Sequence, residues 1–192
     1  MHRKPLLELL ARYAGRHPEE HATVARIRGL VETQADCLLR TCLPGHITAS
    51  AWIVSADRRR FLLTHHRKLG RWLQLGGHVD GDADVARSAL REAREESGME
   101  HFRWALTAGE LVPVDLDVHA IPAHGTDPPH EHHDIRFLLV ADAGQTPRPS
   151  AESIDLRWFE ADRLDEVADE ESLHRLGRKA MRLLSGLETR PA

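Results

Sequence analysis

One helix-type segment stands alone among strand-type runs, and this order is the feature that most constrains the fold. The segment begins near Asp82 or Asp84, either of which could cap a helix, and stops at Gly98, a residue type favoured just beyond a helix end. Apolar runs before and after it predict strands, and helical spacing of apolar residues returns near both ends of the chain. A mixed sheet between helices accommodates this order. The expected strands are 47–55, 61–65, 102–111, 114–121, 132–141 and 154–159, and the expected helices fall within 6–39 and 168–187.

Composition narrows the class of protein. The 192 residues include 26 basic and 30 acidic side chains, giving a net charge of −4, whereas general nucleic-acid and membrane-surface binders carry basic surfaces. No run approaches the roughly 18 apolar residues of a membrane-spanning helix. Two cysteines are too few for a disulfide framework, so we expect a reducing, cytoplasmic compartment. The spacing Cys37-x4-Cys42-x3-His46 lacks a fourth zinc ligand, which favours structural cysteines, but the 14 histidines bring metal binding into consideration.

Three carboxylates crowd the lone helix. Glu92, Glu95 and Glu96 have the i, i+3 and i+4 spacing that places side chains on one helix face. Like charges at this spacing repel, and a divalent cation offsets the repulsion; Mg²⁺ and Mn²⁺ suit such carboxylate ligands. The alternative is a solvated face whose acids pair with arginines of the same helix. An adjacent apolar stripe, and a Gly76-Gly77 turn that lets backbone approach the acids closely, favour the metal site.

The segment resembles the Nudix box, G-x5-E-x7-R-E-U-x-E-E-x-G-U, in which U is aliphatic. Ala83 occupies the position of the first glutamate, with Asp82 and Asp84 on either side. The resemblance implies an α/β fold, the Nudix-like α/β/α sandwich with a mixed sheet, here with an N-terminal helical extension. We expect the helical segment to span 1–44 and the Nudix-like domain 45–192. The matching positions are Gly77, Arg91, Glu92, Ala93, Glu95, Glu96, Gly98 and Met99.

The resemblance also implies a function, the divalent-metal-dependent hydrolysis of a diphosphate linkage in a nucleoside diphosphate derivative or related small molecule. It further implies that Arg91 orients a glutamate by charge-assisted hydrogen bonds. The general base is then one of the box glutamates or a carboxylate outside the box, and Glu152, just before the last expected strand, is a candidate. The implied ligands of Mg²⁺ or Mn²⁺ are Glu92, Glu95, Glu96 and the Gly77 carbonyl.

A histidine-rich segment precedes another expected strand. If the strand begins early, its two-residue period places His130, His132 and Asp134 on one face. His132 and Asp134 could then complete the metal shell or contact phosphate, and this donor set also suits Zn²⁺. An exposed polar loop is the equal alternative.

A basic stretch just upstream of the acidic helix is suited to substrate phosphates. A solvated hairpin end is the alternative, and the tryptophan in this stretch could either stack on a base or sugar or simply pack. The candidate substrate-binding residues are His66, Arg67, Lys68, Arg71 and Trp72.

Two rival functions stay open. Ala83 motivates a catalytically weak Nudix-like regulatory module that binds a nucleotide or diphosphate. An isopentenyl-diphosphate isomerase would keep the fold, but neither cysteine lies in the part of the domain where that reaction needs one. We expect a small-molecule diphosphate as the partner, no membrane and no general nucleic-acid binding, and a homodimer is left open.

Overall fold

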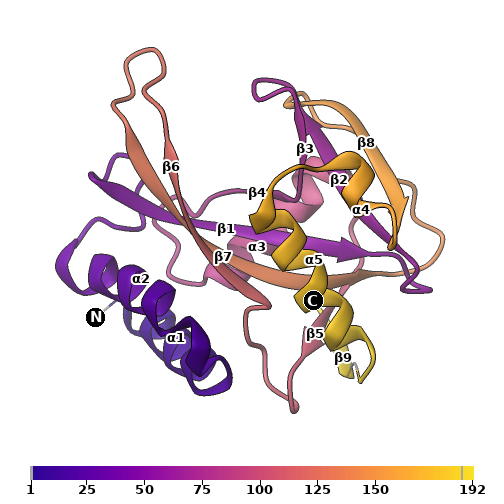
Figure 1. The fold of residues 1–192 in the computed structure, drawn as a ribbon, viewed down its shortest axis with the longest axis horizontal. Coiled ribbons are helices and arrows are strands. Elements are labelled where there is room, and N and C mark those ends of the chain that lie inside the picture. The colour runs from indigo at the N-terminus through magenta and orange to yellow at the C-terminus, as the bar shows by residue number, and fades with distance from the viewer. Residues whose placement is uncertain (1, 187) are drawn as a thin grey trace.

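The strands form one mixed sheet built around β1, Gly45–Val54, whose residues are all buried. The computed structural model, which describes residues 2–186 and 188–192, pairs β1 in parallel with β7, His130–Ala141. On its other side β1 pairs antiparallel with β4, Leu75–His78, and then with β2, Arg60–His66. The sheet order is β3-β2-β1-β7-β5-β9, while β4, β6 and β8 pair with β1, β7 and β2 (Figure 1). The remaining strands are β3 Arg71–Leu73, β5 Phe102–Leu106, β6 Asp115–Ile121, β8 Ser153–Glu160 and β9 Glu188–Pro191.

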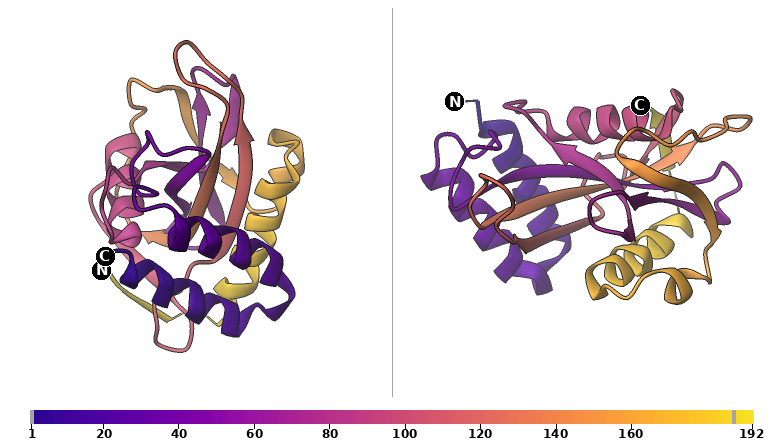
Figure 2. Two further views of the ribbon diagram at one scale, coloured as in Figure 1. Left: turned by 90° about the vertical axis from the view of Figure 1, so that its left-hand side faces the viewer. Right: turned by 90° about the horizontal axis from the view of Figure 1, so that it is seen from above.

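Helices cover both faces of this sheet, as the view from above shows (Figure 2). On one face α3, Val85–Ser97, packs Ala89 into one core with Ile53 of β1. Because side chains alternate along a strand, the neighbouring Trp52 faces the other way, into a second core with Leu176 of α5, Glu171–Leu184. The short helix α4, Leu164–Val167, precedes α5. The expected α/β class, a mixed sheet between helices, is confirmed.

The N-terminal helical extension is also confirmed, and it packs onto the sheet. Helix α1, Lys4–Arg16, and helix α2, His21–Thr33, are joined by a 3₁₀ turn, Pro18–Glu20. Leu10 and Ile27 are almost completely buried, in the same continuous core as α3 and β1. The two helices therefore complete the core of the sheet.

A buried network of charges joins helix α1 to α5. Arg136 of β7 is 2% exposed and donates to Asp115 and Asp117 of β6 over 3.2 and 3.1 Å. Lys179 of α5 donates to Asp115 over 2.7 Å and to the Tyr13 hydroxyl of α1 over 2.7 Å. Removing one partner of such a buried set leaves an uncompensated charge, so the network stabilises the fold only as a whole.

Local sequence sets both ends of α3. The Asp84 side chain accepts a hydrogen bond from the backbone N–H of Arg87 over 3.0 Å, which makes Asp84 the N-cap. Gly98 adopts a left-handed φ of 65° beyond the last turn, and its N–H donates to the Arg94 carbonyl over 2.8 Å. The expected start and end of this helix are confirmed.

The structure corrects the expected secondary structure elsewhere. The Gly76-Gly77 pair, expected as a turn, lies within β4 and pairs with β1. The strand expected over 102–111 ends at Leu106, because a tight turn bridged between Thr107 and Glu110 follows it. The last helix begins at Glu171 rather than near residue 168. No helix in the described ranges is long and apolar enough to cross a membrane.

Candidate functional site

The glycines of β4 lie directly against the acidic side of α3. The Gly76 N–H donates to the Glu96 carboxylate over 2.9 Å. A Cβ built on Gly77 would lie 2.8 Å from Cδ of Glu92 and 2.9 Å from both of its carboxylate oxygens. Only glycine leaves this carboxylate in place, which explains why the strand carries a residue type that strands disfavour.

Arg91 holds the next part of the site together. Its Nη2 donates to the His78 carbonyl at the end of β4 over 2.8 Å. Its Nη1 lies 2.8 Å from the Glu92 carboxylate and 3.1 Å from that of Glu95. One guanidinium thus ties two acids of the helix to the backbone of the neighbouring strand. The orienting role expected for Arg91 stays a prediction.

The three glutamates differ in environment. Glu96 is 6% exposed, and burial, with the nearby charges of Glu92 and Glu152, raises its pKa to about 7 although the Gly76 N–H opposes the shift. Burial raises the pKa of Glu92 as well, against the opposing charge of Arg91. The Glu95 side chain is 60% exposed. The buried Glu96 and the half-buried Glu92 therefore carry charge at a cost that a cation would offset. Their oxygens suit a hard divalent ion, so the donor set fits Mg²⁺ or Mn²⁺.

Glu152 lies near this site although it is far from it in sequence. It sits just before β8, and its charge acts on both Glu92 and Glu96. Arg67 anchors this loop, because its backbone N–H donates to the Glu152 carbonyl over 2.9 Å and its Nη2 donates to the Ser153 carbonyl over 2.8 Å. Glu152 is therefore a carboxylate outside the box that acts on two of the box glutamates, and its role as general base stays a prediction.

Several side chains of the expected phosphate-binding stretch are engaged by other parts of the protein. Arg67 is engaged by carbonyls, as above, and Arg71 forms an ion pair with Glu170, just before α5. Trp72 packs edge-on against Phe159, with ring centroids 4.9 Å apart. Arg71 is thus used in an ion pair and Trp72 in packing. Lys68 is exposed and His66 is half-buried.

The aspartates beside Ala83 have structural partners. Asp82 accepts two hydrogen bonds from the Arg87 guanidinium, both of 2.7 Å, and Asp84 caps the helix. Ala83 itself packs against the hydrophobic core. Both aspartates are therefore engaged by partners at the start of α3.

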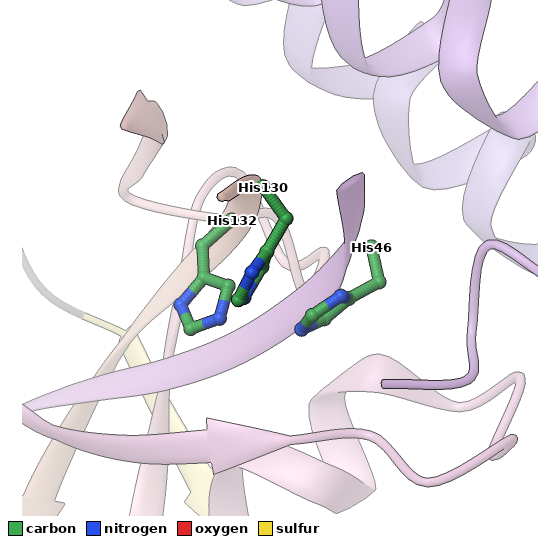
Figure 3. Close-up of side chains that lie close together, drawn as sticks. All are labelled: His46, His130 and His132. Atoms are coloured by element: carbon green, nitrogen blue, oxygen red, sulfur yellow. The ribbon is translucent and has the colours of Figure 1, made fainter. Parts of the chain in front are cut away.

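The histidine segment forms a different group from the expected one. Asp134 is buried and accepts hydrogen bonds from Thr48 Oγ1 over 3.0 Å and Ser50 Oγ over 2.7 Å, as well as from Arg136. Both of its oxygens are therefore used by neighbours of the sheet, which corrects the expected grouping with His132. Strand β1 supplies the replacement. The ring of His46 lies 5.0 Å from that of His130 and 4.8 Å from that of His132, as centroid distances, and Figure 3 shows the three rings together.

The family model of the NUDIX domain matches residues 44–181, most of the chain. The chain belongs to the Nudix family. This membership confirms the expected enzyme class, a Nudix-type pyrophosphohydrolase, and Nudix hydrolases generally use divalent metal ions. A search of curated proteins finds no match to this Nudix sequence.

Solved structures share the fold of this Nudix domain. A NUDIX-family hydrolase from Clostridium perfringens is 23% identical, with a TM-score of 0.56, and the match covers 73% of this chain and 97% of that chain. A C. elegans Ap4A hydrolase is 21% identical, with a TM-score of 0.52 and coverage of 73% and 98%. The E. coli dihydroneopterin triphosphate pyrophosphohydrolase is 14% identical, with a TM-score of 0.56 and coverage of 71% and 95%. At these identities the likeness concerns the fold.

Proposed function

We propose that this Nudix domain hydrolyses a diphosphate linkage in a nucleoside diphosphate derivative or related small molecule, and that it requires Mg²⁺ or Mn²⁺. The observation that carries the proposal is the close approach of the Glu92 and Glu96 carboxylates to the glycine backbone of β4. Two of the structures that share this fold, named as an Ap4A hydrolase and as a dihydroneopterin triphosphate pyrophosphohydrolase, support the substrate class.

Each residue then has a distinct role. Glu92, Glu96 and the Gly77 carbonyl would hold the metal, and the exposed Glu95 would contribute from the solvent side. A bound divalent ion supplies charge neutralisation for the phosphates and lowers the pKa of a water. Arg91 keeps Glu92 in place, and Glu152 takes the proton of the attacking water. Lys68, which is exposed, and His66, which is half-buried, remain candidates for a phosphate contact.

A substrate panel with a metal series tests this function. Untagged protein is incubated with nucleoside diphosphate derivatives, Ap4A included, in Mg²⁺, Mn²⁺ or EDTA, and the phosphate products are measured. We expect turnover only when a metal ion is present, and we expect the Glu96→Gln variant to lose activity. Glu100→Gln, which removes an exposed acid just beyond the same helix, is the matched control. Metal-independent turnover, or full activity in Glu96→Gln, would contradict the proposal.

The surroundings of Ala83 favour a second candidate, a module that binds its ligand but hydrolyses it weakly. The box lacks its first glutamate, and both neighbouring aspartates are engaged by Arg87 or by the helix N-terminus. Ligand binding without product across the panel would select this candidate. A cytoplasmic location and a Nudix-like unit spanning 45–192 stay predictions, and a homodimer stays open.

A further inference from the structure

The structure assigns a second metal site, separate from the glutamates, in which His46, His130 and His132 bind a transition-metal ion such as Zn²⁺. Their ligand nitrogens all lie within 4.8 Å of one another. Figure 3 shows the three rings turned toward a common space, one from β1 and two from β7. Imidazole nitrogens suit Zn²⁺, whereas Mg²⁺ prefers oxygen, so this site and the glutamate site select different ions.

The sheet itself builds the group. His46 and His132 are directly opposite each other in the parallel β1–β7 ladder, and His130 lies two residues earlier on the same face of β7. The backbone therefore fixes the three Cα positions with ladder hydrogen bonds. Tetrahedral zinc with bonds of about 2.0–2.1 Å needs nitrogens about 3.4 Å apart, which small side-chain rotations from the present separations achieve.

His46 gives an independent sign that a ligand belongs here. It is 1% exposed, and within the described part of the chain neither Nδ1 nor Nε2 has a hydrogen-bond partner. Buried polar atoms are almost always paired, and an unpaired one calls for an explanation such as an ion. A metal bond from one of these nitrogens provides that explanation.

The chemistry of the His130 ring is consistent with ligation. The Nδ1 atom of His130 lies 2.8 Å from the Pro128 carbonyl; a proton on Nδ1 directed at this acceptor leaves Nε2 with its lone pair free, the arrangement typical of metal-bound histidines.

Three protein ligands leave one position of a tetrahedral zinc ion for another ligand. Three protein ligands plus water is the usual arrangement of an open zinc site. The centroid of the His78 ring is 5.1 Å from that of the His46 ring and 5.4 Å from that of the His132 ring. His78 is the residue after Gly77 in β4. The histidine site thus adjoins the backbone of the glutamate site while sharing no ligand with it.

Metal binding to untagged protein tests the assignment directly. After EDTA treatment and dialysis, Zn²⁺ is titrated by calorimetry, and Co²⁺ is added to follow the visible absorption of a nitrogen-bound ion. We expect about one high-affinity Zn²⁺ per chain, weakened at least about 100-fold in His46→Ala and in His132→Ala, since removing even a supporting hydrogen bond costs roughly 10–100-fold. Exposed His101 provides the matched control, and His101→Ala should bind as the parent does.

Two further variants distinguish Zn²⁺ binding at the histidines from Zn²⁺ binding at the glutamate site. His130→Ala changes a half-exposed ring at the start of β7, so it should fold normally, and added Zn²⁺ should raise the Tm of the parent but not of this variant. Glu92→Gln should retain the tight Zn²⁺ site whether or not the protein proves to be a hydrolase. Parent-like binding in both His46→Ala and His130→Ala, or loss of tight Zn²⁺ binding in Glu92→Gln, would overturn the assignment.

Discussion

Gly77→Ala tests whether close backbone approach positions the acidic site. The added Cβ would meet Cδ of Glu92 at 2.8 Å, whereas non-bonded carbons rest about 3.5–4.0 Å apart, so the carboxylate must move by about 1 Å. A misplacement of that size costs roughly 10²-fold in a catalytic site. We therefore expect kcat/KM for the best substrate of the panel to fall about 100-fold.

Stability should hardly change in the same variant. The atoms in the way are the end of a flexible side chain, and the pairing of Gly77 with Ala49 in the β1–β4 ladder is preserved. Where the backbone conformation suits alanine, a Gly→Ala substitution stabilises the folded protein by about 0.4–1 kcal/mol, because it reduces the conformational entropy of the unfolded chain. This stabilisation offsets part of the crowding. Thermal unfolding should show a Tm within a few degrees of the parent.

The control and the decisive comparison use the same assays. Gly15→Ala adds a methyl group in α1 where nothing lies within 4 Å, so activity should be unchanged. If Gly77 acts through Glu92, then adding Gly77→Ala to Glu92→Gln should cause little further loss, because the two changes share one mechanism. Full activity in Gly77→Ala, or an additive loss in the double variant, would refute the reasoning.

Three other outcomes follow from the structure. Glu96→Gln should lower kcat by about two to four decades without loss of Tm, whereas Glu95→Gln, at an exposed side chain, should cost less than about tenfold in the same turnover assay. Asp84→Ala should lower the free energy of unfolding by about 1 kcal/mol through the lost N-cap and leave kcat of the folded protein intact; a large fall in kcat would give Asp84 a role in the site. Burial acts to raise the pKa of Asp117, but its hydrogen bond with His119 and the charges of Arg136 and Arg175 outweigh that and hold it below the usual value. The stability it contributes is thus present above its unfolded pKa of about 3.9 and is lost as pH falls below it, so denaturant titrations should show a flatter acid dependence in Asp117→Asn.

Local signals explain what could be predicted from the sequence. The acidic helix carries its own cap at Asp84 and its own left-handed end at Gly98, and both depend on neighbours in the chain. By contrast, the strand character of Gly76-Gly77 arises from pairing with β1, against the low strand propensity of glycine. Because a tertiary contact determines that this segment is a strand, the local sequence could not predict it.

The histidine group shows the same limit at the level of a site. The two-residue period correctly places His130 and His132 on one face, yet it cannot say which strand lies beside them. The parallel pairing brings in His46, which the sequence associates with two cysteines instead. Asp134 shares the face but is captured by the hydroxyls of Thr48 and Ser50 and by Arg136, partners that only the register reveals.

The contacts of the N-terminal helices have a consequence for how the molecule opens. Tyr13 is fully buried and accepts a hydrogen bond from Lys179 of α5, and Ile27 lies in the same core as β1. Both residues precede the family match, which begins at residue 44. Elements that share a core and a charge network open together, as one cooperative unit in native-state hydrogen exchange. The amides of Leu10 and Ile27 should then be as slow to exchange as that of Ile53 in the central strand, and they should lose protection at the same denaturant concentration.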